Sequence, residues 1–334
     1  MAISEDSAAT AAPSRMKDPG HHRRRLLRNP WSKVAAIPMI LTALGVFVGG
    51  TLWTVLHSFS SSRLLPKFDL VERWRAGEFF DQYERLFSAR RWDFSVDNLI
   101  VYGLVSIFFT LFVGFMLAAL LDRKIRGEDA FRTIFLYPFA LSFIVTGLAW
   151  QWILNPELGL PEIVRALGWE SFAFDPLYTR GSSIWNLGLF ELRVNHVMFG
   201  LLIAGLWQGT GLIMCIMLAG LRGIDEDIWK AARVDGIPVW KTYLRVVIPM
   251  MRPVFVTSLV LITSGIVKLY DLVVAMTSGG PGLNSEVPAK YVYDTLFLRQ
   301  NLGQGFAAST MMLVTVAVIL IPWAYLEFGG KKRG

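Results

Sequence analysis

The chain has 334 residues, of which 54% are hydrophobic and only 18% are charged, and its formal net charge is +7. Several uninterrupted apolar stretches are as long as a bilayer is thick, which a soluble protein of this size does not need, so they indicate an integral membrane protein. The positive charge is divided among the loops between these stretches, and this distribution argues against a nucleic-acid partner.

Six membrane-spanning helices are predicted along the chain. Residues 1–33 are polar and basic and predict a disordered cytoplasmic tail. The transmembrane domain is expected at residues 34–330, with a second basic cytoplasmic tail at 331–334. A polar cytoplasmic hairpin, residues 222–246, joins the fourth helix to the fifth. The helices, each with roughly the 20 residues that cross a bilayer, are expected at residues 34–56, 99–121, 133–154, 196–221, 247–277 and 306–328.

Lys and Arg are distributed unequally between the two sets of loops. If the N-terminus is cytoplasmic, the cytoplasmic segments hold 19 Lys and Arg, and the longer external segments hold 12. Cytoplasmic loops of membrane proteins carry such an excess. We therefore predict an all-α, multi-pass membrane protein with both termini in the cytoplasm.

The hairpin at 222–246 has the layout of two short helices. Asp225 is placed to cap the first helix, and acidic residues follow in its first turn. The pair Asp235-Gly236 permits a tight reversal, and Pro238 suits the first turn of a second helix. Such a hairpin between two spans indicates contact with a protein outside the membrane, the alternative being an amphipathic loop lying on the bilayer surface.

The fourth and fifth expected helices hold residues that a lipid-facing helix does not need. In the fourth, Gly205 and Gly209 permit close helix approach, and polar residues surround them. In the fifth, Lys268 and Asp271 are three residues apart and hence on one face of a helix, where they would form an ion pair or face a substrate pathway or a partner.

The stretch from Thr277 to Pro281 is rich in glycine, but it lacks the Lys-Ser/Thr ending and the following helix of a phosphate-binding loop. No Walker A sequence occurs anywhere in the chain, so it is not expected to hydrolyse ATP itself. Four His and the single Cys215 indicate no metal cluster and no pair of nucleophile and base. We therefore expect no enzyme activity, no catalytic residue, no cofactor and no metal site.

These patterns together resemble the permease subunits of sugar-importing ABC transporters of the maltose type, in particular the first-type permease of the pair. The family's loop has Glu-Ala-Ala, three residues, Gly, nine residues, then Ile-x-Leu-Pro. This chain has Lys230-Ala231-Ala232, Gly236 and Val246-Val247-Ile248-Pro249 at the same spacing, with Lys230 in place of Glu. Thr277–Pro281 matches the family's Thr-x-Gly-Gly-Pro stretch after the fifth core helix. The resemblance covers about residues 98–330.

The resemblance implies the type I ABC importer permease architecture, a location in the inner (plasma) membrane of a bacterium, and transport by alternating access. The partners implied are a second permease, two cytoplasmic ATP-binding subunits that hydrolyse the ATP, and a periplasmic or extracellular sugar-binding protein. Contact with the ATP-binding subunits is implied at Lys230, Ala231, Ala232, Asp235, Gly236 and Pro249. We expect substitution of Asp235 or Gly236 to abolish transport and to leave membrane insertion intact.

The resemblance also places the sugar pathway on the fourth and fifth helices, midway through the membrane. Hydroxyl groups of sugars need hydrogen-bonding side chains, and the ring faces of sugars need aromatic ones. The pathway residues expected on this basis are Gly205, Trp207, Gln208, Gly209, Thr210, Leu212, Thr263, Ser264, Lys268 and Asp271.

Three other functions stay open at this point. A permease for another small solute, such as an amino acid or a polyamine, has the same architecture, although the Gly-Gly-Pro stretch argues against it. An ion-coupled carrier would explain Lys268 and Asp271, but it leaves the hairpin without a purpose. A membrane scaffold would not need small and polar residues inside two helices. Copurification of an ATPase separates the importers from the other two, and the sequence does not name the sugar.

Overall fold

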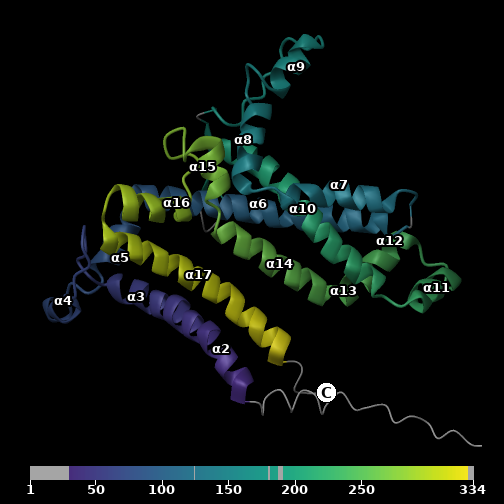
Figure 1. The fold of residues 1–334 in the computed structure, drawn as a ribbon. Coiled ribbons are helices and arrows are strands. Elements are labelled where there is room, and N and C mark those ends of the chain that lie inside the picture. Colours follow the sequence, from purple (N-terminus) through teal and green to yellow (C-terminus); the bar gives the residue numbers. More distant parts are fainter. Residues whose placement is uncertain (1–29, 124, 180, 187–190, 330–334) are drawn as a thin grey trace, which may run out of the picture. The chain divides into compact units, whose positions relative to one another are not determined.

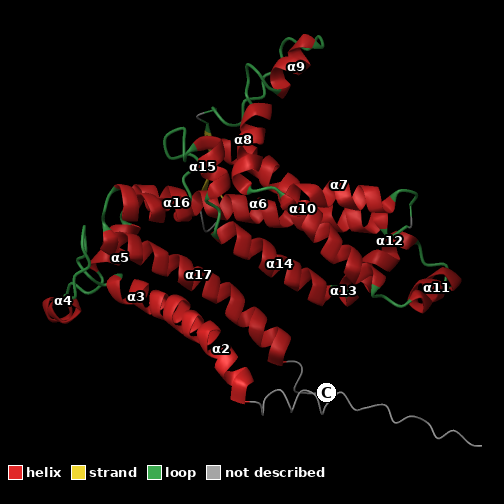
Figure 2. Ribbon diagram, in the orientation of Figure 1, coloured by secondary structure: helices red, strands yellow, loops and turns green. Residues whose placement is uncertain are grey.

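The computed structural model describes residues 30–123, 125–179, 181–186 and 191–329, and these residues are mostly helical (Figure 2). Residues 1–29 of the expected N-terminal tail and the whole expected tail at 331–334 lie outside the described residues. The chain divides into two units, residues 1–53 and residues 54–334, and each is described by itself.

The described part of the first unit is helical throughout. Helix α2 (Pro30–Thr42) continues through a π-helical segment, η1 (Ala43–Gly49), into α3 (Gly50–His57). Residues Ala36–His57 are long and apolar enough to cross a bilayer. Pro38 has no N–H to donate inside α2, and its own carbonyl oxygen accepts a hydrogen bond from the Thr42 hydroxyl at 2.8 Å.

The second unit contains the remaining helices and one antiparallel hairpin in which Ser182 lies opposite Asn195. Its elements, in chain order, are α4 (Leu70–Ala76), α5 (Asp81–Phe87), α6 (Arg90–Leu121), α7 (Glu128–Ala140), α8 (Phe143–Ile153), α9 (Leu160–Ala166), β1 (Ser182–Asn186), β2 (Glu191–Asn195), α10 (Val197–Arg222), α11 (Glu226–Val234), α12 (Val239–Thr242), η2 (Tyr243–Val247), α13 (Ile248–Met250), α14 (Arg252–Val267), α15 (Asp271–Thr277), α16 (Pro288–Tyr293), η3 (Asp294–Leu298) and α17 (Leu302–Gly329).

Within the described residues, four helices are long and apolar enough to cross a membrane, and the number rises to six if each of two bent pairs counts as one span. The four are Ala36–His57, Arg90–Leu121, Val197–Arg222 and Leu302–Tyr325. The architecture of an all-α membrane protein is therefore confirmed. The orientation of the termini stays a prediction.

The two bent pairs differ from the straight helices expected at 133–154 and 247–277. Helices α7 and α8 meet at 102°, because Pro138 removes a helical hydrogen bond and the Ser142 hydroxyl caps the new helix by accepting from the Val145 N–H. The helical segment Val239–Met250 meets α14 at 71°, between Pro249 and Pro253. A further break, at residues 268–270, separates α14 from α15.

Helices α6, α7 and α10 lie side by side and form the centre of the second unit (Figure 1). The backbones of α7 and α10 approach closely at Gly211, which has no side chain. A Cβ built there would lie only 1.8 Å from the carbonyl oxygen of Phe135. Buried side chains from α6, from α10 and from the bend at Met251 form one cluster, which includes Leu121, Met214 and Met217. Helix α14 packs against α6 and α17.

Helix α8 packs mainly on α15 and only to a small extent on the long helix α10 (Figure 1). A Cβ on Gly147 of α8 would lie 2.5 Å from the Cβ of Ala275 in α15, so the absence of a side chain at Gly147 lets the two helices touch. Both helices follow a break, α8 after Leu141 and α15 after residues 268–270. The two pieces beyond the breaks therefore form one packed pair.

The segment after α15 is fixed to the start of α6 by a buried ion network. Arg91 donates to Glu286 Oε1 at 2.7 Å and also pairs with Asp294, and Lys290 pairs with Asp294 at 2.6 Å. Burial raises the pKa of Glu286. Burial also acts to raise the pKa of Asp294, but hydrogen bonds from Lys290 and Arg91 outweigh it and lower that pKa. The network and the Asn98 amide, which donates to the Glu286 carbonyl at 2.8 Å, hold this segment in place.

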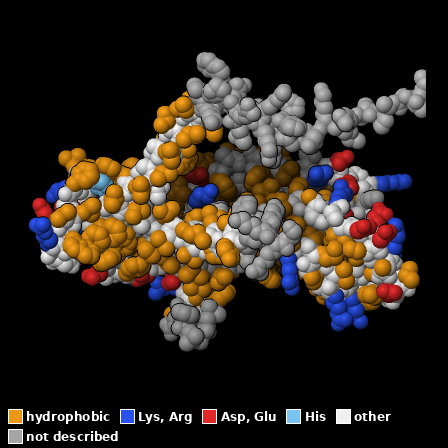
Figure 3. Space-filling model, turned by 90° about the horizontal axis from the view of Figure 1, so that it is seen from below, with side chains coloured by type: hydrophobic (Ala, Val, Ile, Leu, Met, Phe, Trp, Pro, Cys, Tyr) orange, Lys and Arg blue, Asp and Glu red, His pale blue; other side chains and the backbone are white. Residues whose placement is uncertain are grey.

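The surface is largely hydrophobic, as expected of a protein surrounded by lipid (Figure 3). On α6, Leu104 is 60% exposed and Phe108 is 62% exposed, and on α17, Val318 is 65% exposed. Such contiguous apolar surface marks contact with a membrane or with another protein. A dense group of charged side chains covers the end of the molecule where α11 and α12 lie (Figure 3).

Candidate functional site

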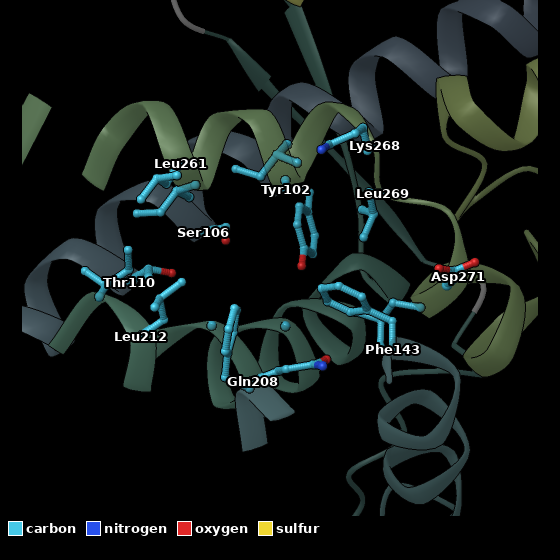
Figure 4. Close-up of a pocket in the computed structure, with 18 of the residues that line it drawn as sticks. Tyr102, Ser106, Thr110, Phe143, Gln208, Leu212, Leu261, Lys268, Leu269 and Asp271 are labelled. Carbon is cyan, nitrogen blue, oxygen red and sulfur yellow. The ribbon is translucent and has the colours of Figure 1, made fainter. Parts of the chain in front are cut away.

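A cavity of about 170 Å³ lies among α6, α10, α14 and the two breaks that precede α8 and α15 (Figure 4). Its wall is mostly apolar, with a small number of polar side chains that point inward. The lining residues are Tyr102, Ser106, Thr110, Phe139, Phe143, Gly205, Gln208, Gly209, Leu212, Ile213, Leu261, Ile262, Gly265, Ile266, Lys268, Leu269, Tyr270, Asp271 and Leu272.

Helix α6 contributes three polar side chains to this cavity. Tyr102, Ser106 and Thr110 follow one another at intervals of four residues, so they lie on one face of the helix. Figure 4 shows the Tyr102 ring crossing the cavity with its hydroxyl directed toward α10. The sequence-based prediction, which placed the pathway on the fourth and fifth helices alone, missed this face. The repeat of a polar residue every four positions in an otherwise apolar helix is the signal that indicates it.

Helix α10 contributes Gly205, Gln208, Gly209 and Leu212, all of which were expected in the pathway. The Gln208 side chain is 2% exposed, and its amide nitrogen donates to the Leu141 carbonyl at 2.7 Å, at the bend between α7 and α8. Its amide oxygen is buried and has no hydrogen-bond partner in the described protein. A buried acceptor without a partner costs about 1–3 kcal/mol. Gln208 is therefore held in place by one end and has an unused acceptor at the other.

The two charged residues expected in the fifth helix also line the cavity, but they do not pair with each other. No ion pair joins Lys268 to Asp271 among the described residues. The physical reason is the break at 268–270, because Lys268 ends α14 and Asp271 begins α15, so the two do not share one helix face. Figure 4 shows the Lys268 amine on the Tyr102 side of the broken segment and the Asp271 carboxylate at its other end.

Four other expected pathway residues do not line the cavity. Trp207 is 42% exposed and makes a ring contact with Trp150. The hydroxyls of Thr210 and Thr263 donate to carbonyls of their own helices, at 2.6 Å to Leu206 and 2.7 Å to Leu259. Ser264 is half-buried outside the lining. Aromatic surface comes instead from Phe139 and Phe143 of the bent pair and from Tyr270.

The hairpin expected at 222–246 is formed by α11 and the helical segment that begins with α12. The Asp225 side chain caps α11 by accepting from the Asp227 N–H at 2.9 Å. Gly236 ends α11 with φ +65°, a left-handed conformation that favours glycine. The Gly236 and Ile237 N–H groups donate to the carbonyls of Arg233 and Ala232, which is the hydrogen-bond pattern of a Schellman motif.

Other expected coupling residues occupy distinct places in the hairpin. Lys230 is exposed and pairs with Asp227 at 2.8 Å and with Glu226 at 4.0 Å, both on its own helix. Ala231 is exposed and Ala232 is buried. Asp235 donates its N–H to Ala231 at the end of α11. Pro249 lies in α13, at the 71° bend before α14.

The hairpin is connected to the long helices through side chains. The rings of Trp229 in α11 and Tyr243 in η2 are 5.3 Å apart, and Tyr243 also contacts Phe115 of α6. Arg222, at the end of α10, pairs with Glu128 at 2.6 Å and with Asp122 at 3.8 Å. A hollow of about 1050 Å³ lies between the hairpin and these residues. These contacts link the hairpin to α6 and the end of α10 to the start of α7.

The hairpin also exposes apolar side chains among its charged ones. Val234 is 87% exposed, Val239 is 58% exposed and Trp240 is 61% exposed. Side chains of this kind at the polar end of a membrane protein indicate contact with another protein.

The family model described as "Binding-protein-dependent transport system inner membrane component" matches residues 96–327, which include most of α6, the elements from α7 to η3, and most of α17. The chain belongs to this family. It is therefore a multi-pass inner-membrane permease of the ABC transporter type, as the resemblance in the hairpin and the Gly-Gly-Pro stretch implied.

Relatives along nearly the whole chain agree with this assignment. A probable ABC transporter permease protein of Pyrococcus horikoshii is 30% identical over 91% of this chain and 98% of its own length. The trehalose/maltose transport system permease protein MalF of Thermococcus litoralis is 25% identical over 88% of this chain and 92% of its own length. The xylose/arabinose import permease protein XacH of Haloferax volcanii is 27% identical over 87% and 86%.

A solved structure has the same fold. It is a chain of a bacterial ABC transporter involved in the import of the acidic polysaccharide alginate. The two chains superpose with a TM-score of 0.72 at 16% identity, over 92% of this chain and 98% of that chain.

Proposed function

We propose that this protein is the membrane-spanning subunit of an ATP-driven sugar importer and that the cavity among α6, α10 and α14 is its half of the sugar pathway. The observation that carries the proposal is Gln208, which lines the cavity and whose buried amide oxygen has no hydrogen-bond partner among the described residues. Sugar hydroxyls donate hydrogen bonds to such an acceptor, and the rings of Tyr102, Phe139 and Phe143 offer apolar surface to a sugar ring.

The relatives support a sugar as the solute. Those named for a substrate include permeases for trehalose and maltose, for xylose and arabinose, and for starch degradation products. The partners proposed are a second permease, two ATP-binding subunits that hydrolyse ATP, and an external sugar-binding protein. One of the similar structures contains a periplasmic protein with a bound alginate pentasaccharide, which supports the last of these.

The contacts between the hairpin and the helices provide a route by which movement driven by ATP hydrolysis is passed to the cavity. Movement of the ATP-binding subunits displaces the hairpin through its exposed apolar side chains, and contacts of Tyr243 and Arg222 pass the movement to α6, α7 and α10. At the cavity, the helix breaks at Leu141–Ser142 and at residues 268–270 allow α8 and α15 to change their angle to α7 and α14. The cavity then opens alternately to the two sides of the membrane.

The test is uptake in cells that lack this chain, with a panel of radiolabelled monosaccharides and disaccharides, one amino acid and glycerol 3-phosphate. We expect uptake of one sugar to be lost and to return with the wild-type chain but not with Gln208→Leu, which has no acceptor. Sugar uptake that does not depend on this chain, together with loss of a different solute, would contradict the proposal.

A second candidate solute is a phosphorylated polyol, and Lys268 is the observation that favours it. Lys268 lines the cavity and has no carboxylate partner among the described residues, and sn-glycerol-3-phosphate permeases of Rhizobium meliloti and Brucella abortus are 24% and 26% identical to this chain. Loss of glycerol 3-phosphate uptake, with all sugars unaffected, would establish this alternative.

A further inference from the structure

The hydroxyl of Tyr102 occupies the space above Gly205. Tyr102 is only 5% exposed, and its ring reaches from α6 across the cavity toward α10 (Figure 4). A Cβ on Gly205 would lie 2.1 Å from the Tyr102 hydroxyl oxygen and 3.3 Å from the ring carbon that carries it. Real Cβ atoms do not approach another heavy atom to 2.1 Å, so any side chain at position 205 would push the Tyr102 hydroxyl away.

Gly209 provides an internal comparison, because it lies one turn further along α10 and also lines the cavity. Nothing lies within 4 Å of a Cβ built on Gly209. A glycine inside a helix costs about 1 kcal/mol relative to alanine. Position 205 therefore has no room for a side chain, because the Tyr102 hydroxyl occupies the space. Position 209 has room for one.

The Tyr102 hydroxyl makes no hydrogen bond to the described part of the protein. A buried tyrosine usually finds a partner for its hydroxyl. The hydroxyl is directed toward α10, the helix that also carries Gln208, whose amide oxygen has no partner among the described residues. The Tyr102 hydroxyl can both donate and accept a hydrogen bond, which suits it to pair with a hydroxyl group on a sugar ring.

We propose that Tyr102 binds the transported solute and determines specificity, and that Gly205 is the positioning residue that keeps the Tyr102 hydroxyl in place. This inference rests on the proposed function of the cavity, and it adds a third helix, α6, to the surface that selects the solute. The ring of Tyr102 lies against the sugar ring, and its hydroxyl exchanges a hydrogen bond with one of the sugar's hydroxyl groups. A sugar with that hydroxyl absent or inverted is then a poorer substrate.

The test uses four variants of the whole transporter: Tyr102→Phe, Gly205→Ala, the double variant, and Gly209→Ala as the matched control. Transport of the solute that the wild type carries best is measured as KM and Vmax, with the membrane level of each variant as a folding control. Tyr102→Phe should raise KM about three- to tenfold with little change in Vmax, which is the value of one neutral hydrogen bond. It should also reduce the preference for that sugar over its epimer by a similar factor.

Gly205→Ala should impair transport more than Tyr102→Phe does, because the displaced tyrosine enters the cavity. The double variant should return to the level of Tyr102→Phe, since removal of the hydroxyl leaves only the 3.3 Å contact. Gly209→Ala should stay near wild type. A merely structural glycine at 205 would not be rescued by loss of a hydroxyl on another helix.

Two results would overturn the inference. One is wild-type KM and epimer preference in Tyr102→Phe, and the other is a double variant no better than Gly205→Ala. Either result is compatible with sugar transport by the wild type, so neither contradicts the proposed function. If the wild type carries an amino acid or glycerol 3-phosphate instead, sugar import is wrong, and the same four variants measured with that solute still decide the role of Tyr102.

Discussion

At the scale of single residues, Gly236 is required by backbone conformation and not by lack of space. Its φ is +65°, and nothing lies within 4 Å of a Cβ built there. An L-residue in this conformation costs roughly 1–2 kcal/mol, and Asn pays less than other residues. The glycine of the family pattern is thus explained by the Schellman turn that ends α11.

We predict that Gly236→Ala lowers transport more than Gly236→Asn does, and that both variants reach the membrane at wild-type levels. Substrate uptake and immunoblots of membrane fractions measure the two effects. Gly223→Ala is the matched control, because Gly223 lies in the same hairpin, before α11, and has an ordinary φ of −80°. Equal loss in the Ala and Asn variants would show that the left-handed turn is not what position 236 supplies.

Lys230 answers a question that the sequence left open. The resemblance places Glu at this position, and where that Glu makes an ionic contact a Lys would need an acidic partner or none. The structure places Asp227 and Glu226 beside it on α11, and Lys230 is 57% exposed. Exposed pairs of this kind contribute about 0–1 kcal/mol, so the substitution is accommodated locally at little cost.

At the scale of helices, the contact between α8 and α15 joins the two pieces that follow the breaks at the cavity. The contact depends on Gly147, whose Cβ would lie 2.5 Å from the Cβ of Ala275. If α8 and α15 move as a pair during transport, separating them should impair transport without changing the long helices.

Gly147→Ala is predicted to reduce the transport rate, and the added Ala275→Gly substitution is predicted to restore much of it, because the second change removes the atom that the first one meets. Initial uptake rates measure the effect, and membrane levels control for folding. A double variant as impaired as the single one would mean that the two helices need not stay packed.

The helical spans follow from the sequence because a bilayer imposes one length on every apolar stretch. The bends and breaks do not follow, because Pro138 and Ser142 act only in combination and Lys268 was consistent with an unbroken helix. The spacing of four residues between Tyr102, Ser106 and Thr110 can be seen in the sequence. That this face of α6 lines the cavity cannot, because it depends on how α6 packs against α10. For the same reason Trp207 and Thr263 satisfied the chemistry of a sugar site and yet lie outside the cavity.

At the scale of the whole molecule, the cavity is only part of a pathway. Leu261 of α14 lines it and is 47% exposed, so the lining continues onto the surface. We propose that the second permease covers this surface and completes the site. The family, the fold and the membrane location could be read from the sequence, since the hairpin and Gly-Gly-Pro patterns are specific. The identity of the solute could not, because it depends on where a few side chains point.

The most direct test of the account is protection of the cavity by the solute. In a Cys215→Ser transporter assembled with its partners, a cysteine replaces either Leu212, which lines the cavity, or Thr179, which is exposed on the loop before β1. Labelling by a small water-soluble thiol reagent is followed with and without the transported sugar. We predict that the sugar slows labelling of Leu212→Cys and leaves Thr179→Cys unchanged. Unchanged labelling of Leu212→Cys, in a complex that still imports that sugar, would contradict the assignment of this cavity to the sugar pathway.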